Sequence, residues 1–190
     1  MKNIYQAAAS DKHRSFIFED NADDNVVWED CDAKYVLDHF GLPIPAEKLP
    51  MRIVHNPDEA KKKAADFNVL GSSSIIVLNV RAMAALEEKL KPLGQFFPLQ
   101  APYSDYAGFH LTRVVENSVI WEKSKFREES GGRVLYTPTL RDGVVGQEYL
   151  FMIPEDRTAV FFSEALKKDI ETHKLSGIDW AHTTSIKLEA

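Results

Sequence analysis

Histidine, cysteine and carboxylate side chains are the groups in this chain that could do chemistry, and their spacing forms no recognised catalytic or metal-binding motif. With a single cysteine, Cys31, and no HExxH pattern, no zinc ligand set is visible. The chain also lacks GxGxxG, GxxxxGK and GxSxG. The six histidines stand singly, at His13, His39, His55, His110, His173 and His182. We therefore expect no metal site, no cofactor site and no catalytic residue.

Three carboxylates of the C-terminal half could in principle act together as general acid and base if the fold brought them close: Glu116, Glu122 and Asp142. Cys31 has no base near it in the sequence and lies among carboxylates, which disfavours a nucleophilic role. Two alternatives stay open. An unrecognised enzyme would show carboxylates or histidines converging in a deep pocket, and a ligand-binding or regulatory domain would show a largely apolar pocket.

One segment accounts for the net negative charge of the chain. Between Glu19 and Asp38 there are eight acidic residues and one basic residue, Lys34, while the formal net charge of the whole chain is −6. Such a segment repels nucleic acid and membrane surfaces and attracts basic partners. The alternative is a solvated loop that serves solubility. The candidate binding residues in this segment are Asp20, Asp23, Asp24, Trp28, Glu29, Asp30 and Asp32.

Trp28 is the large apolar side chain within this acidic segment. It could be the anchor of an interface that is ringed by charge, because tryptophan is enriched among residues that dominate binding energies. Alternatively, it fills the space beneath a loop.

The bulk composition describes an ordinary globular chain of 190 residues, of which 44% are hydrophobic and 27% charged. One cysteine excludes an intrachain disulfide, which is typical of a cytoplasmic protein. The first residues lack the apolar run of a signal peptide, and no stretch is long and apolar enough to span a bilayer. We expect a cytoplasmic protein without a membrane or nucleic-acid partner; the oligomeric state stays open.

The elements that must position these residues are clearest between Thr158 and Ala181, which reads as a strand, a helix capped by Ser163, a glycine stop at Gly177 and a second strand. Residues 74–99 repeat this order, with Asn79 as the cap. The sequence therefore predicts an α+β fold with a mixed, mainly antiparallel sheet and helices packed on one face. The sheet would be built around two similar strand–helix–strand units.

We expect one domain, residues 1–190, with an irregular acidic N-terminal part (1–55) and an α+β core (56–182). Asn56 followed by Pro57 predicts a helix that runs to about Phe67. Ile75 to Leu78 is a continuous apolar run, typical of a strand buried on both faces. Further short strands are predicted at 119–121 and, as the last strand, at 178–180.

The chain from Ile75 onward resembles a bacterial immunity-protein family of polymorphic-toxin systems, immunity protein family eleven. The resemblance covers about 110 residues. Three motifs carry it in order: IIVLNVRAMAALEEKLKPLGQFFPL from Ile75, LTRVVENSVIWEKSKF from Leu111 to Phe126, and FFSEALKKDIETHKLSGIDW from Phe161 to Trp180. Trp121 departs from the family pattern, which has Leu-Asp there.

This resemblance implies a protein that binds and neutralises a cognate toxin, often a nuclease, encoded by an adjacent gene. Such an inhibitor needs no catalysis and no cofactor. The substrate groove of a nuclease is basic, so a surface rich in carboxylates can occupy it. The acidic segment is then the expected contact with the toxin.

Overall fold

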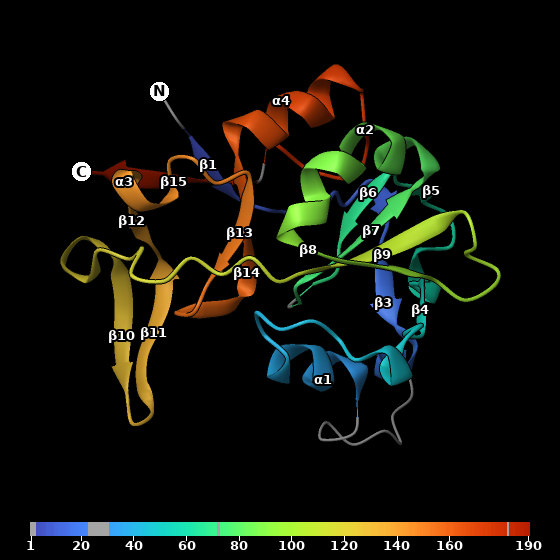
Figure 1. The fold of residues 1–190 in the computed structure, drawn as a ribbon, viewed down its shortest axis with the longest axis horizontal. Helices are drawn as coiled ribbons and strands as arrows, with labels where there is room; N and C mark the ends of the chain where they lie inside the picture. Colours follow the sequence, from blue (N-terminus) through green and yellow to red (C-terminus); the bar gives the residue numbers. More distant parts are fainter. Residues whose placement is uncertain (1–2, 23–30, 72, 182) are drawn as a thin grey trace.

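The computed structural model describes residues 3–22, 31–71, 73–181 and 183–190, and it confirms an α+β fold with mainly antiparallel pairing (Figure 1). The larger sheet has the strand order β12 (Thr139–Arg141), β15 (Thr184–Glu189), β1 (Ile4–Gln6), β14 (Asp156–Ser163), β13 (Leu150–Ile153). The second sheet has the order β6 (Phe67–Val69), β7 (Ile75–Asn79), β9 (Tyr106–Leu111), β8 (Gly94–Pro98).

Strand β7 lies inside the four-stranded sheet and is buried on both faces, as its apolar run predicted. Ile76 and Leu78 contribute to a core beneath the helices α2 (Val80–Leu90) and α4 (Glu164–Thr172). Ile75 and Val77 point to the opposite face, into a second core. Successive side chains of a strand alternate between faces, so one short strand connects both layers.

The two longer helices begin at the predicted caps. The side-chain oxygen of Asn79 accepts hydrogen bonds from the backbone N–H groups of Arg81 and Ala82, both at 3.0 Å. Ser163 Oγ accepts one from Leu166 N at 3.2 Å. Both helices lie together in Figure 1 and pack their apolar stripes onto strands of both sheets, so this one core joins the two sheets.

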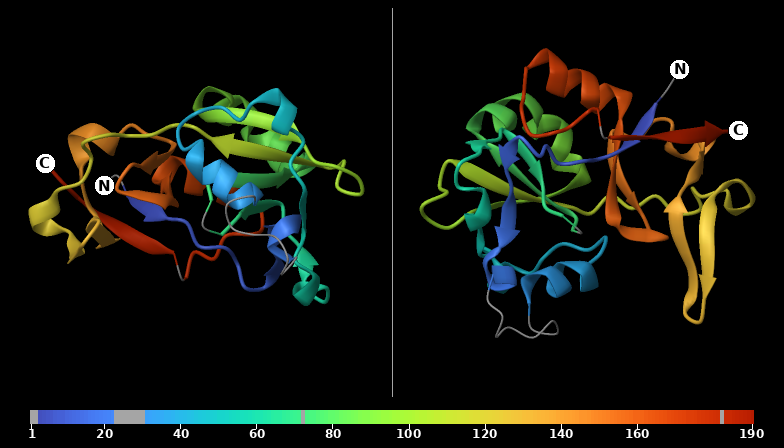
Figure 2. Two further views of the ribbon diagram at one scale, coloured as in Figure 1. Left: turned by 90° about the horizontal axis from the view of Figure 1, so that it is seen from below. Right: turned by 180° about the vertical axis from the view of Figure 1, so that it is seen from behind.

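The second core lies on the other face of the four-stranded sheet. Here α1 (Asp32–Asp38) and the antiparallel ribbon of β3 (Phe16–Phe18) and β4 (Ile53–His55) pack against β7 and β8. Figure 2 shows this layer from two further directions. The 3-10 helices η1 (Glu19–Ala22) and η3 (Ala46–Lys48) flank it. These elements carry the described part of the acidic segment.

The remaining elements are short. A two-stranded ribbon of β10 (Lys125–Glu129) and β11 (Gly132–Thr137) projects from the five-stranded sheet (Figure 1). Strands β2 (His13–Arg14) and β5 (Lys63–Ala64) pair in parallel. The others are α3 (Asp142–Val145), η4 (Pro57–Glu59), η5 (Lys91–Leu93) and η6 (Trp121–Lys123).

Among the described residues, no helix is long and apolar enough to cross a membrane.

The helix predicted from Asn56 to Phe67 is wrong. Asn56 does cap a turn, because its side chain accepts a hydrogen bond from Asp58 N at 3.1 Å, but the turn is only η4. The chain then forms β5 and β6. Phe67 pairs with Leu78 of β7 and donates its N–H to Ser176 O at 3.0 Å. Burial of Phe67 in the sheet outweighs the local helical signal.

Two of the predicted strands are reduced to isolated bridges. Ile178 pairs only with Ala9, and the last strand is β15. Val119 pairs only with Leu140, and η6 follows at Trp121. The unit predicted at residues 74–99 is thus formed by β7, α2 and β8. In the unit predicted at Thr158–Ala181, β14 and α4 are followed by a single bridge in place of the second strand. The similarity of the two units stays a prediction.

Candidate acidic pocket

The structure brings together the two candidate binding residues that it describes. Asp20 lies in η1 and Asp32 is the first residue of α1. The backbone N–H of Asp32 donates a hydrogen bond to Asp20 Oδ2, with 2.5 Å between the two atoms. Five further candidates lie outside the described residues: Asp23, Asp24, Trp28, Glu29 and Asp30.

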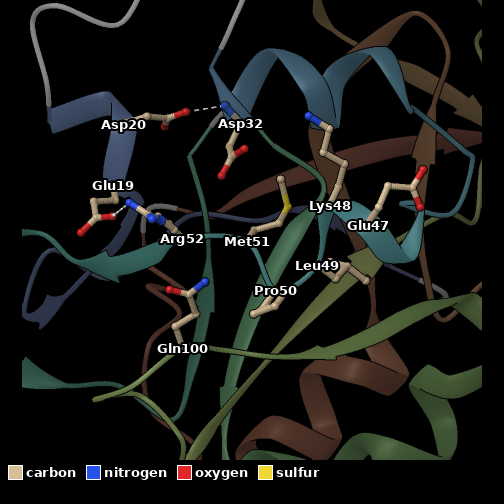
Figure 3. A pocket seen from close by; sticks show the side chains of 10 residues that line it. All are labelled: Glu19, Asp20, Asp32, Glu47, Lys48, Leu49, Pro50, Met51, Arg52 and Gln100. Carbon is tan, nitrogen blue, oxygen red and sulfur yellow. Dashed lines mark hydrogen bonds and ion pairs between the residues drawn. The ribbon is translucent and has the colours of Figure 1, made fainter.

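Asp20 and Asp32 line a pocket of about 650 Å³ on the face of the molecule that carries α1 (Figure 3). The Asp32 carboxylate points toward the middle of this pocket. Two basic side chains, Lys48 and Arg52, also line it. The full lining is Glu19, Asp20, Asp32, Glu47, Lys48, Leu49, Pro50, Met51, Arg52 and Gln100. We call this the acidic pocket, because its four carboxylates exceed its two cations.

The charges of the acidic pocket are only partly compensated. Burial, followed by the negative charge of Asp20, raises the pKa of Asp32, although a backbone hydrogen bond from Arg52 acts in the opposite direction. Asp20 Oδ1 is buried and has no hydrogen-bond partner among the described residues. Arg52 contacts Glu19 at 3.4 Å, but both side chains are more than half exposed, so this pair contributes little.

The β3–β4 ribbon ends next to the acidic pocket, because Glu19 directly follows β3 and Arg52 directly precedes β4. Phe16, Ile17 and Phe18 pair with His55, Val54 and Ile53 in an antiparallel register. The register continues beyond the strands, where Glu19 N donates to Arg52 O at 2.8 Å. Phe16, Phe18 and Ile53 are buried in the second core. The ribbon thereby fixes Glu19 and Arg52 at the pocket entrance.

Cys31 and two side chains of the four-stranded sheet hold α1 in place. Cys31 is buried and caps α1 by accepting a hydrogen bond from Lys34 N at 3.4 Å. The Gln95 side chain bonds both backbone groups of Ile44, at 2.8 and 3.0 Å. His110 Nε2 donates to Leu42 O at 2.9 Å. A buried, capping cysteine has a structural role here.

His110 and Gln95 are the residues that sequence reasoning missed. His110 is fully buried and its Nδ1 lies 3.0 Å from Ser74 Oγ, and burial lowers its pKa. Their partners in the α1 layer are 68 and 51 residues away in the chain. No local pattern could reveal contacts of that separation.

The three carboxylates considered as an acid–base set gain no mutual contact. Among the described residues, no hydrogen bond or ion pair joins any two of Glu116, Glu122 and Asp142. Asp142 instead lines a separate pocket of about 570 Å³ with residues of β15. No group of three His, Cys, Asp or Glu side chains in the described ranges could hold a metal ion.

Glu59 anchors the start of the β3–β4 ribbon and gives a testable pH dependence. Its Oε2 accepts hydrogen bonds from Ser15 N at 2.6 Å and Ser15 Oγ at 2.7 Å, and Lys62 contacts Oε1 at 2.7 Å. Burial opposes ionisation, but these partners outweigh it and lower the pKa of Glu59 to about 2. We expect Glu59→Gln to reduce the free energy of unfolding at neutral pH by about 1–2 kcal/mol.

The sign of the pH effect follows from the depressed pKa. Glu59 contributes stability above the ordinary glutamate value of 4.5, and this stability is lost as pH falls toward about 2. Urea unfolding at several pH values checks this, because Glu59→Gln should differ most from the parent at neutral pH and least near pH 2. An equal loss at every pH would contradict the assignment. Glu171→Gln, at an exposed position, is the control.

No protein-family model matches this chain, and no curated protein does. The resemblance to an immunity-protein family therefore rests on the order of the three sequence motifs alone.

Proposed function

We propose that this protein is an inhibitor of the immunity type, which binds a basic protein toxin and occludes its active surface without catalysis. The observation that carries the proposal is the acidic pocket, in which Asp20 and Asp32 adjoin and the four carboxylates are only partly compensated by the two cations, Lys48 and Arg52. The motif order of the C-terminal two thirds supports the same class of function. The proposed setting is the bacterial cytoplasm.

A cationic side chain of the partner is the group that this pocket would accept. Among the described residues nothing donates to Asp20 Oδ1, which is buried, and the Asp32 carboxylate points into the pocket. Arginine is well suited, because its planar guanidinium can donate to two carboxylate oxygens at once. Desolvation of the pocket by the partner would strengthen these hydrogen bonds, whereas the surrounding carboxylates would accelerate association.

The acidic pocket predicts how variants change binding. We expect the double variant Asp20→Asn, Asp32→Asn to slow association with the toxin by about tenfold at low salt and to flatten its dependence on salt. The amides keep the shape, and the amide oxygen introduced at position 20 could still accept the N–H of residue 32. Association rates measured by stopped-flow fluorescence at low and high salt check this. Extending the amides to Asp23, Asp24, Glu29 and Asp30 should enlarge the effect.

The probe is the protein encoded beside this chain's gene, co-expressed with it and purified. Glu171→Gln removes one exposed charge from α4, on the helical face, and serves as the matched control. If the double variant keeps the parent's association rate and salt dependence, the acidic segment serves solubility only. If the neighbour neither co-purifies nor is inhibited, the immunity function is wrong.

One observation favours a second candidate, an enzyme with a carboxylate pair. A raised pKa at Asp32, with the carboxyl group of Asp20 beside it, is the environment in which one carboxyl group can donate a proton and the other accept it. An enzyme requires turnover of a small substrate, which Asp32→Asn would abolish. A ligand-binding domain is less favoured, since most residues lining the acidic pocket are polar or charged.

A further inference from the structure

His55, the last residue of β4, lies within a cluster of aromatic rings between the second core and the surface. Its imidazole lies 4.2 Å from the ring of Phe16, its partner across the ribbon. The rings of Tyr103 and Tyr106 meet it edge-on, at 4.9 and 5.9 Å. Tyr103 also accepts a hydrogen bond from His55 N at 3.1 Å. The cluster thus ties the ribbon to β9 and the loop before it.

Within the described ranges, Nε2 of the His55 imidazole has no acceptor for a second proton. His55 Nε2 is buried and has no hydrogen-bond partner among the described residues. A protonated ring would bury an N–H donor there without a partner, which costs free energy. Two charged groups act on the ring from neighbouring elements. Arg14 of β2 disfavours the cation, and Asp105, which precedes β9, favours it. Burial dominates and lowers the pKa of His55.

We propose that His55 is a pH-sensitive latch: protonation of its imidazole loosens the β3–β4 ribbon and, with it, the position of Glu19 and Arg52, which line the acidic pocket. Phe16 and His55 form the pair at one end of the ribbon, and the Glu19–Arg52 hydrogen bond closes the other end, at the pocket. Only two residue pairs, Ile17–Val54 and Phe18–Ile53, lie between these ends, so loss of packing at His55 reaches Glu19 and Arg52 in the pocket lining. The latch acts in the free protein and does not depend on a partner.

The direction of the pH effect follows from the linkage between proton binding and folding. A histidine that folds preferentially in its neutral form contributes stability that is fully present above its ordinary pKa of 6.5. This stability is lost as pH falls below that value. Protonation of His110 would change stability in the same direction, because burial also lowers its pKa. His110 lies in β9, however, and its hydrogen bond is to Leu42 O. The two residues are therefore distinguished by which amides lose protection.

Hydrogen exchange of the intact chain, followed by NMR at pH 7.5 and 5.5, tests the latch. The reporters are the amides of Glu19 and Asn56, which bond Arg52 O and Ser15 O across the ribbon at 2.8 and 2.9 Å. After correction for intrinsic exchange, their protection should fall several-fold at the lower pH. Protection of Leu111 N, which bonds Ser74 O in the four-stranded sheet, should fall less.

The variant His55→Phe keeps an aromatic ring, cannot be protonated and retains the backbone donor to Tyr103. It should abolish the loss of protection at Glu19 and Asn56, whereas His173→Gln, at an exposed histidine, should not. A parent protein whose reporters keep equal protection at both pH values would overturn the proposal. A His55→Phe variant that still loses protection at low pH would do the same.

Discussion

Replacing Gly177 with alanine is expected to lower the free energy of unfolding by about 4 kcal/mol. Gly177 has φ +119°, a conformation that costs other residues about 1–3 kcal/mol. A Cβ at this position would lie 1.8 Å from Phe67 O, in the backbone of β6. Relief of that overlap requires movement of β6 and adds about 1–3 kcal/mol. Urea unfolding monitored by tryptophan fluorescence measures the total.

The contact at Gly177 is between two backbones, which makes the prediction specific. Ser176 O accepts a hydrogen bond from Phe67 N, and Gly177 O accepts one from Ser10 N. The segment after α4 therefore lies between β6 and the N-terminal chain. Gly143→Ala is the matched control, because nothing lies within 4 Å of a Cβ there and alanine favours helix α3. Equal stability of the two variants would refute the close approach.

Asp66→Ala is expected to have the second largest effect, a loss of about 3 kcal/mol. Asp66 is 6% exposed and its carboxylate accepts hydrogen bonds from two other segments. Asn79 Nδ2 donates to Oδ1 at 2.8 Å, and Ser176 donates both N–H and Oγ–H to Oδ2 at 2.9 Å. Removal of the carboxylate leaves these partly buried donors without their acceptor. Arg81 also contacts it at 3.1 Å but is largely exposed, so the ion pair contributes less.

The loss of unfolding free energy caused by Asp66→Ala should depend on pH. Burial alone would raise the pKa of Asp66, but the hydrogen bonds from Ser176 and Asn79 and the charge of Arg81 outweigh it and lower the pKa. Its contribution is therefore present above the ordinary value of 3.8 and disappears as pH falls below it. The difference between the parent and Asp66→Ala, followed by denaturant unfolding from neutral to acidic pH, should shrink accordingly.

Two controls separate the network at Asp66 from a general effect of removing a carboxylate. Asp66→Asn keeps the size and one acceptor oxygen, so it should lose about 2 kcal/mol, less than alanine. Asp58→Ala, at an exposed position in η4, should change stability by less than about 0.5 kcal/mol. An Asp66→Ala protein as stable as Asp58→Ala would show that the network is not formed.

Local patterns in the sequence identified much of the scaffold. The caps Asn79 and Ser163 begin α2 and α4, because capping uses the residue's own oxygen and the N–H groups two or three positions on. The run Ile75–Leu78 forms the buried strand β7. Each of these signals is complete within a few residues, so it can be recognised without knowledge of the tertiary contacts.

Gly177 shows where a local signal gave the right residue for the wrong reason. A glycine after a helix predicts the left-handed terminal position, yet Lys174, with φ +51°, occupies that conformation just after α4. Gly177 is required by the backbone of Phe67, 110 residues earlier in the chain. The predicted helix at 56–67 fails for a similar cause, since Phe67 pairs with Leu78 of β7 and donates its N–H to Ser176 O, both outside the predicted helix.

The sequence alone determined the α+β class, the starts of α2 and α4 and the concentration of acidic residues between Glu19 and Asp38, all of which depend on residue type and short spacing. Only the tertiary structure decided that Asp20 and Asp32 adjoin in one pocket with Lys48 and Arg52, and that His110 and Gln95 hold the layer carrying them. These contacts join residues that are distant in sequence. Chain folding sets their proximity, and no local pattern encodes it.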